Sequence, residues 1–306
     1  MDFRTLIQTQ PEILEDRYAL TFSKQVLPHR IAGAFSHFGV VMLKNALPPS
    51  TLMAGAEAFR LYLQSQPSDQ SSFEGEHAPG RGENDSGSWH SPWMVRHGNQ
   101  LPAASVLAAI IRSWAWDVIE QICQSSNIVV LLKFCTARHS IDRSLGVGGH
   151  QDAKVVASDV PLSMWIPLQD IVPGHHSGLG FVVPHPDRVL PTLPHNDIGA
   201  ECVLRDLRSL WIPRYALGDL TIHSRLSPHF TTGFGTLSDR FSLEVRAMAR
   251  AAASPEHIDP AIYVSRRSGM PTIVDVKSSA GIGADEFLDS SQLAPVTAKQ
   301  LRRGFA

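Results

Sequence analysis

The chain has 306 residues, a formal net charge of −2 and 43% hydrophobic residues, a composition that predicts a folded globular protein. Lysine and arginine form no cluster, which argues against a dedicated nucleic-acid-binding protein. The first residues are polar and acidic, and charged residues interrupt the most apolar stretch, 103–122, so we expect neither a secretory signal nor a membrane span. The three cysteines are too widely spaced for a disulfide framework or a CxxC zinc site, which favours a reducing, cytoplasmic location.

The N-terminal half predicts helices around a single strand. A β-branched run at 39–43 predicts the strand, and Ser50, after two prolines, is expected to cap a helix that ends near Gln64. Residues 66–100 are polar and rich in glycine, serine and proline but contain tryptophans, so we interpret them as a lid loop over a site. Apolar residues at helical spacing then predict one long helix over 103–122.

The C-terminal half predicts short strands separated by turn residues. They are expected at 128–135, 163–168, 178–184, 209–213, 219–223 and 240–248. We therefore predict a mainly β fold with flanking helices, organised as one domain over 1–306. Its core is expected at 33–248, followed by a C-terminal extension at 253–306 with one strand-like segment at 271–276.

A His-x-Asp pair is the first candidate for metal binding. On a strand, residues i and i+2 project to the same face, so an imidazole and a carboxylate can reach one ion. The motif occurs four times, as His150-Gln-Asp152, His185-Pro-Asp187, His195-Asn-Asp197 and His257-Ile-Asp259. Prolines surround the last three, whereas His150 follows a glycine-rich turn and Asp152 precedes KVVASDV, a plausible strand. We therefore select His150 and Asp152.

A distant histidine would complete a face of two imidazoles and one carboxylate, the ligand set typical of non-haem Fe(II) oxygenases. His223 and His229 both compete for this position. Arg240 stands eleven residues after His229, and we expect a hairpin to bring the two side by side. A guanidinium grips a carboxylate through two hydrogen bonds, and Ser242 adds a hydroxyl on the same strand face. This combination fits a dicarboxylate co-substrate such as 2-oxoglutarate.

Four segments resemble the phytanoyl-CoA dioxygenase (PhyH)-like family of 2-oxoglutarate oxygenases. They are AFSHFGVVMLKNAL, GGHQDAKVV, LSMWIPLQDIVPGHHSGLGFVVPHPDRV and GDLTIHSRLSPHFTTGFGTLSDRFSL, which together span about 33–248. The resemblance implies a double-stranded β-helix, that is, a cupin-like jelly roll, with Fe(II) and 2-oxoglutarate as cofactors. It selects His229 over His223, because His229 stands at the family's distance before Arg240. It also implies that the metal ligands are His150, Asp152 and His229, and that Arg240 and Ser242 bind the co-substrate.

The resemblance implies oxidation by O2 of an unactivated C–H bond, by default hydroxylation, with release of succinate and CO2. Halogenation is not expected, because Asp152 stands where halogenating relatives have a small residue. The chain departs from the family where His176-Ser177-Gly178 replaces the usual Asn-Gly and where His185-Pro-Asp187 replaces Gly-Ser-His. These positions shape the rim, so they concern the substrate rather than the metal.

The lid loop offers the candidate substrate contacts. They are Trp89, His90, Trp93 and Arg96, and with Arg81 they suit a mid-sized small molecule that carries an acidic group. Two alternatives remain open: a cupin-like isomerase or lyase that uses another metal, and a non-catalytic binding protein on the same fold.

Overall fold

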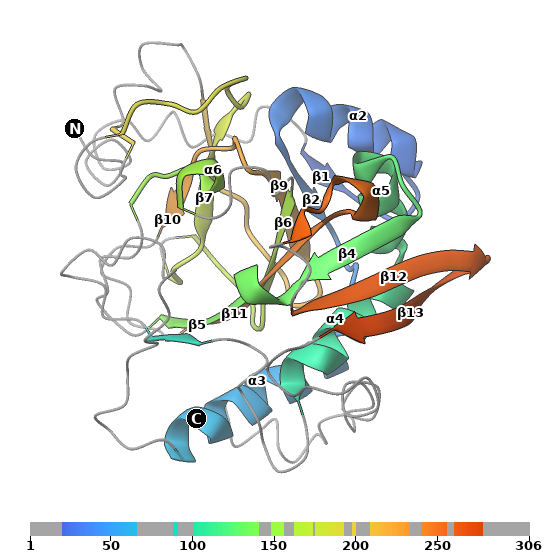
Figure 1. Cartoon of the computed structure of the whole chain (residues 1–306). Helices are drawn as coiled ribbons and strands as arrows, with labels where there is room; N and C mark the ends of the chain where they lie inside the picture. Colours follow the sequence, from blue (N-terminus) through green and yellow to red (C-terminus); the bar gives the residue numbers. More distant parts are fainter. Residues whose placement is uncertain are drawn as a thin grey trace.

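The structure is a computed structural model. It describes residues 20–65, 88–90, 101–140, 148–155, 162–173, 175–192, 198–199, 209–232, 240–255 and 260–277 (Figure 1). The helices are α2 (Pro28–Phe38), α3 (Pro49–Ser65), α4 (Pro102–Arg112), α5 (Trp114–Cys123) and α6 (Asp152–Val155), with 3-10 turns η2 (Leu132–Phe134) and η4 (Arg250–Ala252).

Thirteen strands are assigned in these ranges. They are β1 (Thr21–Phe22), β2 (Val40–Leu43), β3 (Ser88–His90), β4 (Asn127–Leu131), β5 (Thr136–Ser140), β6 (Leu162–Pro167), β7 (Leu179–Val183), β8 (Ser209–Trp211), β9 (Leu220–Ser224), β10 (His229–Thr231), β11 (Arg240–Ala249), β12 (Ala261–Ser268) and β13 (Met270–Lys277). The ten-stranded sheet has the order β1-β2-β9-β6-β11-β4-β12-β13, and β5 pairs with both β11 and β3. A second sheet has the order β10-β7-β8.

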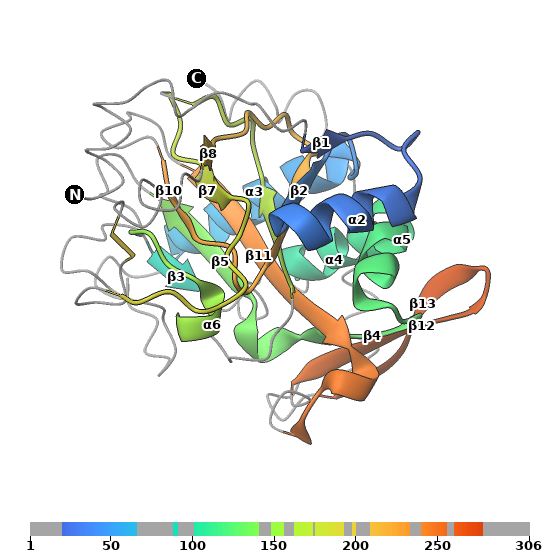
Figure 2. The same ribbon diagram turned by 90° about the horizontal axis from the view of Figure 1, so that it is seen from above.

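The two faces of the large sheet have different partners because side chains alternate along each strand. One face packs against helices α2 to α5 in the largest apolar cluster, which includes Ile222 of β9 and Leu243 of β11. The other face packs against the small sheet through Trp165, Phe181 and neighbouring apolar residues (Figures 1 and 2). The molecule is thus a β sandwich with helices on the outside of its larger sheet.

The strands expected at 39–43 and in the C-terminal half are present, with corrected ends, whereas KVVASDV, expected as a strand, begins inside helix α6. The run at 128–135 leaves the strand geometry after Leu131, where η2 begins, and a further strand, β5, follows. The range 33–248 leaves out β1, β12 and β13, although β1 pairs with β2 and β12 pairs with β4 in the large sheet. The β12–β13 hairpin projects from the edge of this sheet (Figures 1 and 2).

The helices differ from the sequence prediction at two places. The first predicted helix begins at Pro49, so Ser50 lies inside it rather than at its cap, in agreement with the preference of proline for the first helical turn. The predicted helix at 103–122 is two helices, because Ser113 has an extended backbone and its Oγ accepts a hydrogen bond from the Ala115 amide, 3.2 Å away. Within the described ranges no single helix is long and apolar enough to cross a membrane, and α4 and α5 pass that test only as a pair bent by 77°.

Candidate metal centre

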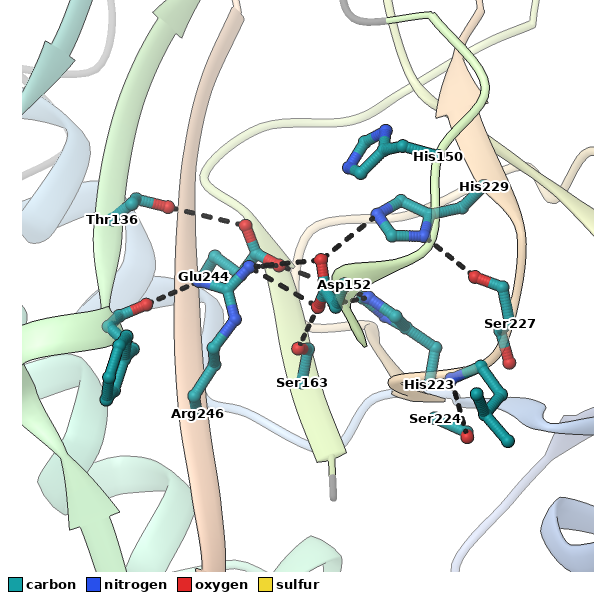
Figure 3. Close-up of polar contacts among 12 residues, drawn as sticks. Thr136, His150, Asp152, Ser163, His223, Ser224, Ser227, His229, Glu244 and Arg246 are labelled. Atoms are coloured by element: carbon teal, nitrogen blue, oxygen red, sulfur yellow. Dashed lines mark hydrogen bonds and ion pairs between the residues drawn. The ribbon is translucent and has the colours of Figure 1, made fainter. Parts of the chain in front are cut away.

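His150, Asp152 and His229 lie together between the two sheets. One ligand atom from each lies within 4.8 Å of the other two (Figure 3). His150 and His229 form an isolated β-bridge, with 3.0 Å hydrogen bonds in both directions between their backbones. Asp152 is the first residue of α6. The prediction that His150 and Asp152 share one strand is therefore wrong, although their side chains do reach the same point.

Both imidazoles present Nε2 to this point because Nδ1 is engaged elsewhere. His150 Nδ1 lies 2.9 Å from the Gly148 carbonyl, and His229 Nδ1 lies 3.0 Å from the Ser227 carbonyl. A carbonyl oxygen only accepts, so in the neutral form of each ring Nδ1 carries the proton and Nε2 keeps its lone pair for a ligand. Burial and the neighbouring rings of His150 and His223 hold the pKa of His229 well below its ordinary value, which keeps this imidazole neutral.

The loop that carries His229 rests on Gly39, the residue that ends α2. Gly39 has a φ of 77°, and its carbonyl accepts hydrogen bonds from the Ser224 amide, at 2.8 Å, and from Ser227 Oγ, at 2.6 Å. An added Cβ at Gly39 would stand 2.5 Å from Ser227 Oγ. The end of α2 thus determines where the Ser227 carbonyl meets the His229 ring.

Asp152 is almost fully buried, and four polar side chains among the described residues lie close to it. Ser163 Oγ donates to Asp152 Oδ2 at 2.6 Å, and Arg246 Nη2 lies 3.3 Å from the same oxygen. Nε2 of His223 and Nε2 of His229 lie 3.7 and 3.8 Å from the carboxylate oxygens. Burial opposes ionisation, but the Arg246 guanidinium outweighs it, so the pKa of Asp152 lies well below its usual range.

Asp152 also belongs to a second group, with His223 and Glu244, whose ligand atoms likewise lie within 4.8 Å of one another. A cation of the protein already lies within this group, because Arg246 Nη2 is 2.8 Å from Glu244 Oε1 as well as 3.3 Å from Asp152 (Figure 3). A metal ion at this point would be repelled by the guanidinium. The group of His150, Asp152 and His229 is therefore the better metal site.

Gln151, between the two candidate ligands, is fully buried. Its Oε1 accepts from the Leu190 amide at 2.7 Å, and its Nε2 donates to the carbonyls of Leu226, at 2.6 Å, and Arg188, at 3.1 Å. Sequence reasoning assigned no role to this position. The contacts show that it ties the segment carrying His150 and Asp152 to two other loops.

A pocket opens beside His150 and His229. It contains about 480 Å³ of space, including the part open to solvent, and its lining includes Arg240 and Ser242. Arg240 is 1% exposed, and its Nη1 donates to the Ser177 carbonyl at 3.2 Å and to Ser177 Oγ at 3.1 Å. In the described residues the expected hairpin does not pair His229 with Arg240: His229 lies in β10 of the small sheet and Arg240 in β11 of the large one, so they face the pocket from opposite sheets.

Only part of the predicted lid lies in the described residues. Trp89 and His90 belong to β3, which pairs with β5 and places Trp89 opposite Arg138. Trp93, Arg96, Arg81 and the rest of the predicted lid loop lie outside the described residues, as do the competing pairs at His195 and His257. His223 is fully buried against Asp152.

Comparisons with known proteins connect this fold to solved structures. A scan against family models and a search of curated proteins found no match. The epimerase SnoN in complex with Fe3+, alpha ketoglutarate and nogalamycin RO is 18% identical, with a TM-score of 0.54 over 89% of this chain and 96% of that chain. The non-heme alpha ketoglutarate dependent carbocyclase SnoK from nogalamycin biosynthesis is 14% identical, with a TM-score of 0.54 over 90% and 96%. EctD from S. alaskensis, with 2-oxoglutarate and 5-hydroxyectoine, is 14% identical, with a TM-score of 0.53 over 82% and 87%.

At these identities the similarities concern the fold. They confirm the predicted class, a mainly β jelly-roll core with flanking helices.

Proposed function

We propose that this chain is an Fe(II)- and 2-oxoglutarate-dependent oxygenase, related to the PhyH-like group that its motifs resemble. The observation that carries the proposal is the convergence of two imidazoles and one carboxylate beside a pocket lined by Arg240 and Ser242. Two histidines and a carboxylate on one face of an ion leave positions for a chelating co-substrate and O2. The structural neighbours described with alpha ketoglutarate or 2-oxoglutarate support the same function.

In this proposal each residue has a distinct task. His150, Asp152 and His229 hold the ferrous ion, while Ser163 and Arg246 orient the Asp152 carboxylate. Arg240 and Ser242 bind the carboxylate of 2-oxoglutarate that does not reach the metal. The chemistry supplied by bound ferrous iron, 2-oxoglutarate and O2 is oxidation of an unactivated C–H bond, with succinate and CO2 as co-products. Hydroxylation is the simplest outcome, and stereochemical inversion or ring closure would use the same site.

The test is an anaerobic titration of the Fe(II)-loaded chain with 2-oxoglutarate, followed through the visible charge-transfer band that bidentate chelation produces. We expect the band in the wild-type chain and its loss in His150→Ala. In Arg240→Ala the affinity for 2-oxoglutarate should be lower than in the wild type by about tenfold or more, because a charge-assisted carboxylate contact disappears. Arg112→Ala, which alters an exposed arginine at the end of α4, is the matched control and should bind like the wild type.

Two results would contradict the proposal. A wild-type chain that binds iron without developing the band would favour a cupin-like isomerase or lyase, or a binding protein. An unchanged co-substrate affinity in Arg240→Ala would remove the role given to that residue. Asp152→Asn is preferable to an alanine variant at this position, because it keeps the shape of the side chain beside Arg246.

A further inference from the structure

His223 is a fully buried histidine to which the proposed function gives no task. It lies in β9 of the large sheet, opposite Val40 of β2 on one side and Ser163 of β6 on the other. Its ring packs against two others, with centroid separations of 5.5 Å to Phe181 and 4.6 Å to His229. An imidazole outside the candidate ligand set therefore lies directly against a candidate ligand.

Neither ring nitrogen of His223 has a hydrogen-bond partner among the described residues. A buried polar group without a partner lowers stability, so its presence in a folded protein calls for an explanation. Its Nε2 lies 3.7 Å from Asp152 Oδ2 and 3.9 Å from Glu244 Oε1, just beyond hydrogen-bond distance. An ionised carboxylate only accepts hydrogen bonds, so the tautomer that suits both neighbours carries its proton on Nε2.

The two oxygens of the Asp152 carboxylate have different surroundings (Figure 3). Oδ1 lies on the side of His229, 3.8 Å from its Nε2. Oδ2 accepts a hydrogen bond from Ser163 Oγ at 2.6 Å and lies on the side of His223. Arg246 Nη2 is 3.4 Å from Oδ1 and 3.3 Å from Oδ2, so it does not distinguish them. Ser163 and His223 thus mark Oδ2 as the oxygen on the protein's side.

We propose that His223 is a positioning residue for the metal ligand: its Nε2–H donates to Asp152 Oδ2 and leaves Oδ1 alone for the ion. The inference rests on the proposed function, because that function makes Asp152 a metal ligand. A carboxylate that binds through both oxygens occupies two coordination positions, whereas one oxygen occupies one. Binding through Oδ1 alone therefore preserves positions for a chelating co-substrate and O2. Nε2 reaches hydrogen-bond distance after an approach of about 0.5 Å.

An apolar side chain would suit this position in the metal-free fold at least as well as an imidazole does. The ring packs on Phe181, and no described group would lose a hydrogen bond if its nitrogens were removed. The donor gains its value when Asp152 holds the metal and Oδ2 must be kept away from the ion. Stability of the metal-free chain and metal affinity should therefore respond to this residue in opposite directions.

The test compares two substitutions of nearly equal shape in the full chain. His223→Leu removes the donor, and His223→Gln keeps an amide N–H that can reach Asp152. Calorimetry measures Zn(II) affinity without co-substrate. We expect the affinity to fall about 10- to 100-fold in His223→Leu and to stay within about threefold of the wild type in His223→Gln. His37→Leu, at an exposed position of α2, is the control and should bind Zn(II) like the wild type.

Two further readouts separate positioning from a purely structural role. In urea unfolding of the metal-free chain, the midpoint of His223→Leu should be at or above that of His223→Gln, because leucine leaves no buried polar group unpaired. This order is opposite to the order of Zn(II) affinity, which a packing effect would not produce. In the Co(II)-loaded chain, the visible ligand-field absorption should weaken in His223→Leu alone, because a second oxygen of Asp152 raises the coordination number.

Three results would overturn the inference. They are an unchanged Zn(II) affinity in His223→Leu, equal losses of affinity in both variants, and a Co(II) spectrum of His223→Leu identical to that of the wild type. Cooperative urea transitions show that the variants are folded, and His223→Met, which also lacks an N–H, repeats the comparison if His223→Leu does not fold. Failure of the proposed function has a different signature, a wild-type chain that develops no charge-transfer band with Fe(II) and 2-oxoglutarate.

Discussion

Gln151 provides a direct test of how the candidate ligands are held in place. Its buried amide accepts one hydrogen bond from the Leu190 amide and donates two, to the carbonyls of Leu226 and Arg188. Only an amide combines one acceptor and two donors in this geometry. We therefore expect Gln151→Leu, which keeps a similar volume, to leave the Leu190 N–H and the Leu226 carbonyl without their partner.

The loss of stability in Gln151→Leu can be worked out from these two unpaired backbone groups. A buried polar group that loses its partner costs about 1–3 kcal/mol, so Gln151→Leu should lower the free energy of unfolding by about 2–6 kcal/mol. Gln151→Glu places a carboxylate against two carbonyl oxygens, which raises the pKa of the new carboxyl above its unfolded value. Its destabilisation should therefore be largest at neutral pH and shrink as pH falls and the carboxyl takes up a proton.

Urea unfolding of the metal-free chain measures the stability change, and Zn(II) titration by calorimetry measures the site. We expect metal affinity to fall about 10- to 100-fold, the effect of losing a group that orients ligands. Gln121→Leu, at an exposed position of α5, is the control and should stay within about 0.5 kcal/mol of the wild type. Wild-type stability and metal affinity in Gln151→Leu would refute the reasoning.

Two further predictions concern charge at the site in the metal-free chain. Because the pKa of His229 is lowered in the folded state, the unfolded state takes up a proton first as pH falls below about 6.5, and stability should fall by up to about 1.4 kcal/mol per pH unit. Urea unfolding at a series of pH values measures this slope. His229→Gln should flatten it, whereas His29→Gln, a control at an exposed position, should not. A slope in His229→Gln equal to that of the wild type would contradict the lowered pKa of His229. Arg246→Met should cost about 3–5 kcal/mol, because the carboxylates of Asp152 and Glu244 lose their counter-ion. Added Zn(II) should raise the melting temperature of this variant more than that of the wild type, and equal melting temperatures without metal would contradict the role of Arg246.

The candidate ligands could be predicted from sequence because few combinations satisfy the chemistry. Proline excluded three of the four His-x-Asp pairs, and the family spacing before Arg240 selected His229 over His223. The local geometry could not be predicted in the same way. Asp152 begins a short helix, and His150 pairs with His229 through a single bridge. Contacts with distant loops hold this segment, and no local pattern encodes them.

The prediction of a hairpin that brings His229 beside Arg240 was wrong for a related reason. Alternation along a strand shows which residues share a face but not which sheet the strand joins. The two strands belong to different sheets and still face one pocket. The prediction that Arg240 and Ser242 share a strand face depends only on alternation, and both residues line that pocket.

Helix boundaries at two places, the ends of α2 and the junction of α4 with α5, were visible in the sequence but were not used. Pro28 begins α2 and Gly39 ends it with a positive φ, the usual asymmetry of helix termini. Ser113 divides the long apolar segment because its side chain caps α5. At Gly39 a conformational signal determined the boundary, whereas the apolar pattern alone suggested the start of a strand. At Ser113 a polar cap determined the boundary, whereas apolar periodicity alone suggested an uninterrupted helix.

The polar residues of β11 connect the fold to the site most closely. Arg240, Ser242, Glu244 and Arg246 alternate with Leu243, Val245 and Ala247, so a buried central strand presents one apolar and one charged face. Charged side chains are costly inside a sandwich unless each has a partner or a ligand. Arg246 pairs with both Glu244 and Asp152, which orients a candidate metal ligand. Arg240 and Ser242, on the same face of β11, also line the pocket, so a single strand contributes to both halves of the proposed site.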